Sequence, residues 1–237
     1  MGKAKKPALK LLPPDWREAI WRQACEPEWR QSRPQLLPAL AVLWLTGCRS
    51  AELAKGAHVA VRGDYLLIRL RGAKCVDAAG RERGQPTRMM GFAIDAGANP
   101  ALKLLHALSA HYSVDGAAQF TITHDEDYLY NSIVQLGKST FPRLRTRVSP
   151  YCFRHQVASD LKADPSVSLE DAAKVMGHLS DYSIGKYGHA AHGRKGQGGR
   201  VRAPFVQTAR PIKHSPKVDR LSRFKLASAK RRDHKQG

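Results

Sequence analysis

Acidic residues are scarce in this chain of 237 residues, which holds 20 Asp and Glu against 40 Lys and Arg and carries a net charge of +20 at pH 7. The imbalance is greatest near the C-terminal end, where residues 188–237 contain 14 Lys or Arg and only two acids, Asp219 and Asp233. A positive field of this size attracts polyanions through phosphate contacts and the release of counterions. The charge therefore favours a polyanionic partner, and a ribosomal or other RNA-binding protein would also account for it.

Long hydrophobic runs and paired cysteines are also lacking. The longest apolar run, residues 39–45, is far too short to cross a bilayer, and residues 1–6 precede no segment that resembles a secretory signal. The four cysteines stand singly with no C-x-x-C spacing, so no zinc ribbon or redox motif is recognisable. We therefore expect a globular cytoplasmic protein with reduced thiols and no membrane partner.

The apolar pattern predicts an α+β protein, mainly α-helical, with a small antiparallel β-sheet. Leu66, Ile68 and Leu70 alternate along one predicted strand, residues 90–94 alternate along another, and the polar residues 72–86 connect the two. One predicted helix begins near Asp15. The other predicted helices cover residues 38–46, 98–111, 128–138, 151–162, 168–176 and 180–187.

Composition divides the chain into three parts. Residues 1–14 form a predicted basic N-terminal arm, residues 15–190 a central domain, and residues 191–237 a basic, flexible C-terminal tail. A glycine-rich stretch at 193–199 is typical of a flexible link, and a short helix is predicted around 218–231.

Three short motifs occur in a fixed order. Residues 46–53 read Thr-Gly-Cys-Arg-Ser-Ala-Glu-Leu, residues 151–155 read Tyr-Cys-Phe-Arg-His, and residues 176–178 read Met-Gly-His, with Tyr187 nine residues after the histidine. Together they resemble the tyrosine recombinase, or phage integrase, family, which shows T-G-x-R-x-x-E-L, then H-x-x-R-H, then L-G-H and a later tyrosine. The resemblance covers roughly residues 30–190. It implies the catalytic-domain fold of these DNA breaking-rejoining enzymes for residues 15–190.

The resemblance implies that Tyr187 attacks a DNA phosphate and forms a covalent 3′-phosphotyrosine, with no metal, ATP or other cofactor. Physical chemistry supports this assignment, because a phosphate that gains charge in its transition state needs positive groups around it. Arg49 and Arg154 would form a bidentate clamp on that phosphate. A free tyrosine has a pKa near ~10, so the phenol needs help to lose its proton. His178 is the candidate for that help, or for a hydrogen bond to a phosphate oxygen.

Further roles are carried over from the family. Lys74, which follows Gly72 in the predicted hairpin, matches the lysine that protonates the leaving 5′ oxygen. Glu52 lies three residues after Arg49 and would orient it. His155 would support the site by bonding to backbone or to Glu52.

Tyr151 stands where the family has a histidine. A phenol donates a hydrogen bond to phosphate but cannot act as a base near neutral pH. A catalytically degraded DNA-binding protein on the same fold therefore stays an alternative, as does a nicking-closing enzyme of the type IB topoisomerase kind.

The resemblance also implies double-stranded DNA as the partner and a homo-oligomer, a tetramer on two duplexes, during strand exchange. Such a protein would be associated with the nucleoid. Family members carry a separate helical domain before the catalytic one, and only about 30 residues precede the match here. The basic arm and tail would then supply part of the grip on DNA through phosphate contacts.

Overall fold

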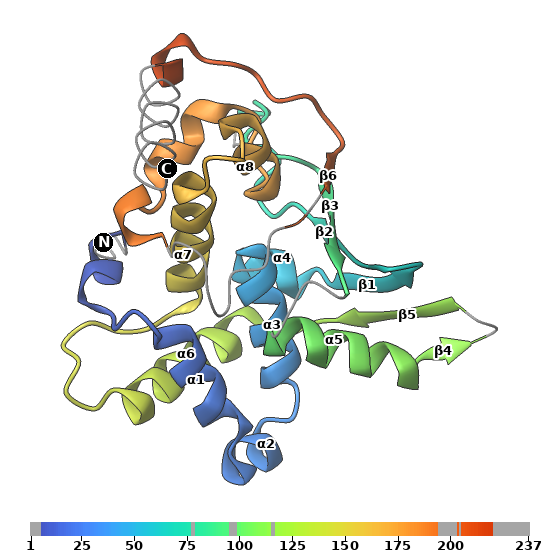
Figure 1. Cartoon of the computed structure of the whole chain (residues 1–237), viewed down its shortest axis with the longest axis vertical. Coiled ribbons are helices and arrows are strands. Elements are labelled where there is room, and N and C mark those ends of the chain that lie inside the picture. Colours follow the sequence, from blue (N-terminus) through green and yellow to red (C-terminus); the bar gives the residue numbers. More distant parts are fainter. Residues whose placement is uncertain are drawn as a thin grey trace, which may run out of the picture.

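The chain adopts an α+β fold in a computed structural model that describes residues 6–76, 79–94, 99–114, 117–193, 203 and 205–219. Helices gather on one side and a twisted sheet lies on the other (Figure 1). The α-helices are α1 (Trp16–Cys25), α2 (Pro27–Ser32), α3 (Leu36–Thr46), α4 (Ser50–Ala54), α5 (Pro100–His111), α6 (Glu126–Thr140), α7 (Pro150–Ala163) and α8 (Leu169–Val175). The short 3₁₀ helices are η1 (Lys6–Leu11), η2 (Asp181–Lys186), η3 (Ala190–His192) and η4 (Pro216–Val218).

Helix α3 forms the centre of the helical part because its sequence is apolar almost throughout. A helix that is hydrophobic all round is stable only when neighbours cover it, and α3 packs against α1, α5 and α7. Trp44 near its end meets Trp21 of α1 edge to face, with ring centroids 5.7 Å apart. Gly47 ends α3 in the left-handed conformation, φ 58°, which an L side chain rarely adopts.

The sheet is antiparallel and has the strand order β4-β5-β1-β2-β3-β6. Its strands are β1 (Ala57–Arg62), β2 (Tyr65–Arg71), β3 (Thr87–Ala93), β4 (Ser113–Val114), β5 (Ala117–Ile122) and β6 (Phe205–Thr208). The predicted alternation holds in β2, where Leu66, Ile68 and Leu70 are all fully buried. The α+β class and the antiparallel sheet are thus confirmed, and the sheet is larger than predicted since β4, β5 and β6 add to it.

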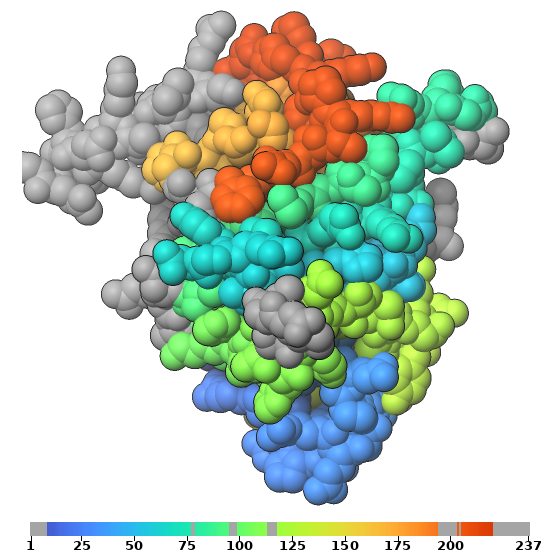
Figure 2. Space-filling model, turned by 90° about the vertical axis from the view of Figure 1, so that its right-hand side faces the viewer, coloured from blue at the N-terminus to red at the C-terminus, as the bar shows by residue number. Residues whose placement is uncertain are grey.

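The two terminal segments pack more closely than the sequence suggests. Leu9 and Leu12, within the predicted loose arm, are buried in the hydrophobic core. Strand β6 lies within the predicted flexible tail, yet it pairs with β3, and the Phe205 ring covers Gly91 and meets Tyr65 at 5.6 Å. Figure 2 shows this C-terminal segment in red against the cyan and green sheet. The predicted glycine-rich link and the helix around 218–231 fall almost wholly outside the described residues.

Helix α7 is tied to α1 by a buried polar network. Arg17 Nη2 donates to Asp160 Oδ2 at 2.8 Å, and both side chains are buried. Gln156 links the two helices again, because its amide accepts from Trp16 Nε1 (3.1 Å) and donates to Asp160 Oδ1 (2.9 Å). This network fixes the helix that carries Arg154. No helix among the described residues is both long enough and apolar enough to span a membrane.

We expect Asp160→Asn to lower the free energy of unfolding by about 3 to 5 kcal/mol, because the buried Arg17 guanidinium loses its countercharge. The matched control is Asp15→Asn, whose ion pair with Arg22 is 3.9 Å long and exposed, and it should cost less than about 1 kcal/mol. Urea unfolding of the two variants measures both values. Equal losses of unfolding free energy in the two variants would mean that the buried ion pair stabilises the fold no more than the exposed one.

Candidate active site

The first motif forms a turn between α3 and α4. The Thr46 hydroxyl donates to Val42 O (2.7 Å) and accepts from the Cys48 N–H (3.1 Å), which fixes the turn. A Cβ at Gly47 would lie only 2.9 Å from Val157 Cβ, so glycine alone allows α7 to approach this closely. The turn therefore ends with Arg49 at the N-cap position, directly before α4.

Arg154 is fully buried in the middle of α7. Its Nη1 donates to Gly47 O (2.8 Å) and its Nη2 to Met176 O (2.7 Å), so one guanidinium joins all three motifs. Burial, reinforced by the neighbouring Arg49 charge, lowers the pKa of Arg154 to about 10. The group still carries its full charge at neutral pH.

Glu52 lies between two arginines. Its carboxylate accepts from Arg49 Nη1 at 2.7 Å and from the Arg49 backbone N–H at 2.8 Å, as the predicted orienting role requires. On its other side Arg88 of β3 donates to both oxygens, at 3.1 and 2.9 Å. Burial alone would raise the pKa of Glu52, but the charges of Arg88, Arg154 and Arg49 outweigh it and hold this pKa far below its usual range.

Sequence reasoning missed Arg88, although a signal for it existed. Arg88 precedes Met90 and Phe92 at the same alternating spacing, so it shares their buried face, and a buried arginine needs a carboxylate partner. The alternation predicted for residues 90–94 therefore extends back to Arg88.

The Tyr187 phenol lies between the two motif arginines. The Arg154 guanidinium carbon is 4.7 Å from the centroid of the Tyr187 ring, and the charge of Arg49 also acts on the phenol. Burial raises the pKa of Tyr187, but the charges of Arg154 and Arg49 outweigh this effect and the net pKa is lowered. The three groups that the motifs single out, distant in sequence, thus lie close together.

The rings of His178 and His155 both lie next to the tyrosine ring, with centroids 5.1 and 5.4 Å from its centroid. Burial and the charge of Arg154 hold the pKa of His178 well below its usual value, so the ring is neutral and its Nε2 accepts from Arg154 Nη2 at 3.3 Å. His155 uses its Nδ1 to accept from the Gly188 N–H at 3.2 Å. His155 thus contacts backbone, next to the tyrosine.

Lys162, which the motifs do not include, holds the tyrosine segment on α7. Its buried ammonium donates to the carbonyl oxygens of Ile184, Tyr187 and Gly188. Gly188 has φ 25°, and a Cβ there would overlap Ser159 and the His155 carbonyl. A glycine directly after the tyrosine is the only sequence signal of this close docking.

Tyr151 lines a shallow depression together with residues of the first two motifs. The lining residues are Cys48, Arg49, Ser50, Pro150, Tyr151 and Arg154. Tyr151 is 41% exposed, so part of this residue is open to solvent beside Arg49 and Arg154.

Lys74 lies in the loop between β2 and β3, exposed to solvent. The loop is anchored beside the third motif, because the Gln85 N–H donates to Gly177 O (3.1 Å) and the Gln85 amide donates to His178 O (3.2 Å). The Lys74 backbone packs against Gly84 of the same loop. The structure therefore brings the Lys74 loop to the site, but no interaction among the described residues joins the ammonium to Tyr187 or to the two arginines.

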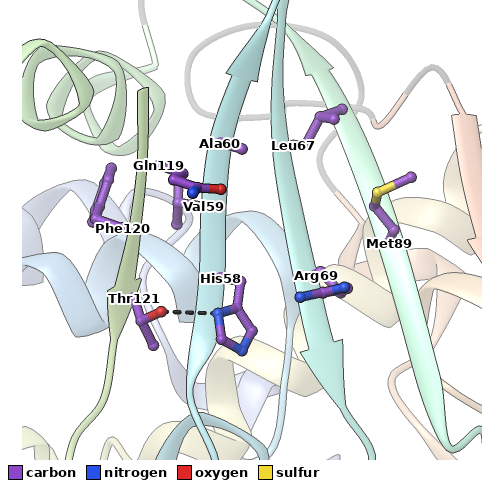
Figure 3. Close-up of a pocket in the computed structure, with 9 residues that line it drawn as sticks. All are labelled: His58, Val59, Ala60, Leu67, Arg69, Met89, Gln119, Phe120 and Thr121. Carbon is purple, nitrogen blue, oxygen red and sulfur yellow. Dashed lines mark hydrogen bonds between the residues drawn. The ribbon is translucent and has the colours of Figure 1, made fainter. Parts of the chain in front are cut away.

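A larger groove of about 430 Å³ lies elsewhere, on the outer face of the sheet (Figure 3). Its lining includes His58, Arg69, Met89 and Thr121, and the Thr121 hydroxyl bonds to His58 Nδ1 at 2.8 Å. None of the motif residues reaches it, so the candidate site is the small charged depression.

No family model matches this chain, and no curated protein matches it. Among solved structures, one described as the crystal structure of XerA recombinase resembles it with a TM-score of 0.48 and 20% sequence identity. That match covers 74% of this chain and 58% of the other, so the chain spans less than two thirds of the XerA recombinase chain.

We expect Arg49→Ala to raise the pKa of the Tyr187 phenol, because a positive charge that favours the phenolate is removed while the Glu52 carboxylate remains. Titration of ¹³C-labelled tyrosine ring signals by NMR measures this value, with Tyr187→Phe identifying the signal. Arg33→Ala is the control, since that guanidinium lies over Trp29 instead. An unchanged or lowered Tyr187 pKa in Arg49→Ala would show that the two groups do not interact in solution.

Proposed function

We propose that this chain is a tyrosine-type site-specific recombinase or integrase that breaks and rejoins strands of double-stranded DNA. The observation that carries the proposal is the Arg154 guanidinium lying 4.7 Å from the centroid of the Tyr187 ring, with the Arg49 charge also acting on the phenol. A phenol among ordinary surface groups is a poor nucleophile, whereas one between two fixed cations loses its proton more easily. The same cations attract the phosphate that the phenolate would attack.

In the proposed reaction, the Tyr187 oxygen forms a bond to phosphorus and the bond from phosphorus to the 5′ oxygen breaks. The product is a 3′-phosphotyrosine, and the leaving 5′ oxygen takes a proton. One phosphodiester replaces another, so the reverse attack by a 5′ hydroxyl rejoins DNA without ATP. Lys74 is the proposed proton donor, because its loop is bonded to the Gly177–His178 turn.

Arg49 and Arg154 would bind the non-bridging oxygens as charge accumulates on them. Removal of one such donor from an enzyme site typically slows the reaction by about 10²- to 10³-fold. His178 is neutral, so it would orient Arg154 and the phosphate through hydrogen bonds and add no positive charge. Homo-oligomer formation on two duplexes is part of the proposal, since strand exchange needs more than one cleavage.

One observation favours the alternative of a DNA-binding protein without cleavage activity. The position of the expected histidine holds Tyr151, whose exposed hydroxyl can donate a hydrogen bond to phosphate but carries no positive charge. The experiment below separates the two candidates.

We expect the protein to form an SDS-stable adduct with a nicked suicide DNA substrate in the absence of metal ions and ATP. Tyr187→Phe should abolish the adduct, because the attacking oxygen is missing. Tyr182→Phe is the matched control: it lies five residues earlier, is 49% exposed and faces Lys217 at 5.7 Å, so it should retain the adduct. Gel electrophoresis with labelled DNA measures both.

Loss of the adduct in Tyr182→Phe and not in Tyr187→Phe would contradict the assignment of the nucleophile. Salt-sensitive DNA binding with no adduct in the wild-type chain would support the alternative without cleavage.

We expect Lys162→Met to slow adduct formation by about 10- to 100-fold at saturating DNA, because the tyrosine segment loses the ammonium that holds its carbonyl groups and reacting atoms must be placed within a fraction of an ångström. Lys186→Met is the control, since it removes the same charge from an exposed position next to Tyr187. Rates come from single-turnover time courses, and urea unfolding checks that both variants are folded. Equal rates for the two would remove Lys162 from the positioning of the nucleophile.

A further inference from the structure

The stretch from Tyr128 to Ser159 contains no Asp or Glu. Its loop between α6 and α7 places Arg143, Arg145 and Arg147 at alternate positions, and all three are exposed. We call these three residues the arginine row. The loop runs in yellow between α6 and α7 in Figure 1.

The residues between the arginines face the protein. Leu144 packs against the hydrophobic core, Thr146 is half-buried and Val148 is fully buried. Val148 docks onto α6 at Gly137, where a Cβ would lie only 2.7 Å from Val148 Cβ. The inward residues thus hold the backbone of the loop, so the arginine row is presented outward from a fixed support.

No carboxylate among the described residues pairs with the arginine row. Two buried arginines behave differently, since Arg17 is bonded to Asp160 and Arg88 to Glu52. A row of three guanidinium groups without countercharge repels itself, and it gains most from a partner that carries several negative charges.

The arginine row leads directly into the candidate site. Arg147 precedes Pro150 and Tyr151, which line the depression with Arg49 and Arg154. Helix α7 rises about 1.5 Å per residue, so only about one turn separates its start from Arg154. A polyanion bound in the depression would therefore continue along the arginine row.

We propose that the arginine row binds successive phosphates of the DNA strand next to the phosphate that Tyr187 attacks. This inference rests on the proposed function. It assigns the binding of the DNA backbone next to the attacked phosphate to the loop between α6 and α7. Guanidinium groups suit this task, because their planar forks bind phosphate oxygens in pairs while carrying no information about base sequence.

The experiment measures equilibrium binding of a short DNA duplex by the full chain, between about 50 and about 200 mM salt. In the triple variant Arg143→Ala/Arg145→Ala/Arg147→Ala, affinity at the lower salt should fall by about 10- to 100-fold. The slope of log K against log salt should become shallower by about 2 to 3, because each neutralised phosphate contributes about 0.9. The control Arg22→Ala/Arg30→Ala/Lys103→Ala removes the same charge from exposed positions on α1, α2 and α5.

Phosphate ethylation interference locates the contacts. In the wild-type chain, ethyl groups on the phosphates beside the cleavage position should block binding, and this interference should disappear in the triple variant. An equal loss of affinity in the triple variant and the control would overturn the proposal, as would an unchanged salt slope. Binding of polyglutamate as tightly as of duplex DNA would overturn the commitment to nucleic acid.

The wild-type adduct assay separates this proposal from the proposed function. Suppose that the triple variant loses DNA binding, the control variant does not, and the wild-type chain forms no adduct. The role of the arginine row in DNA binding is then supported, and the proposed cleavage function is contradicted. If the wild-type chain forms the adduct but the triple variant binds DNA as tightly as the wild type, the cleavage function is supported and the role of the arginine row is contradicted.

Discussion

The structure of the candidate site depends on the burial of one guanidinium group, that of Arg154. A cation taken out of water costs several kcal/mol unless hydrogen bonds replace its hydration. Two of those bonds go to the carbonyl groups of Gly47 and Met176, which belong to different motifs. The positive φ of Gly47 and the turn at the end of α8 aim these carbonyl groups at the guanidinium. The three motifs are therefore held together in space by the buried Arg154 guanidinium and the backbone carbonyl groups that bind it.

The charge around this cation does not balance. Arg49, Arg88 and Arg154 surround a single buried carboxylate, Glu52, which they keep ionised by lowering its pKa. The remaining positive charge lowers the pKa values of Tyr187 and His178. Such a site is stabilised by an additional anion, and the phenolate or a bound phosphate supplies one.

The motifs allowed Arg49, Arg154, His178 and Tyr187 to be placed in one site from sequence, because each carries a local pattern of glycine, arginine or histidine. Arg88 and Lys162 could not be found in this way, since their partners lie far away in the chain and their own neighbourhoods read as an ordinary strand and helix. Strand β6 was missed for a related reason: four residues in a basic, glycine-containing segment show little alternation, and only the exposed edge of β3 makes them a strand. Local patterns predicted the helices and the hairpin well, while long-range partners decided the buried charges and the sheet edges.

A tyrosine at position 151 has a definite electrostatic consequence in this setting. With His178 neutral and a phenol at position 151, the positive charges of the described residues that lower the pKa of the Tyr187 phenol come from arginine. Guanidinium groups keep their charge throughout the physiological pH range, even for Arg154 with its pKa of about 10. The cationic character of the site is therefore insensitive to pH near neutrality, and the ionisation of the Tyr187 phenol is the step that pH controls. A histidine at position 151 would have added a second titration between pH values of about 6 and 7, which this chain avoids.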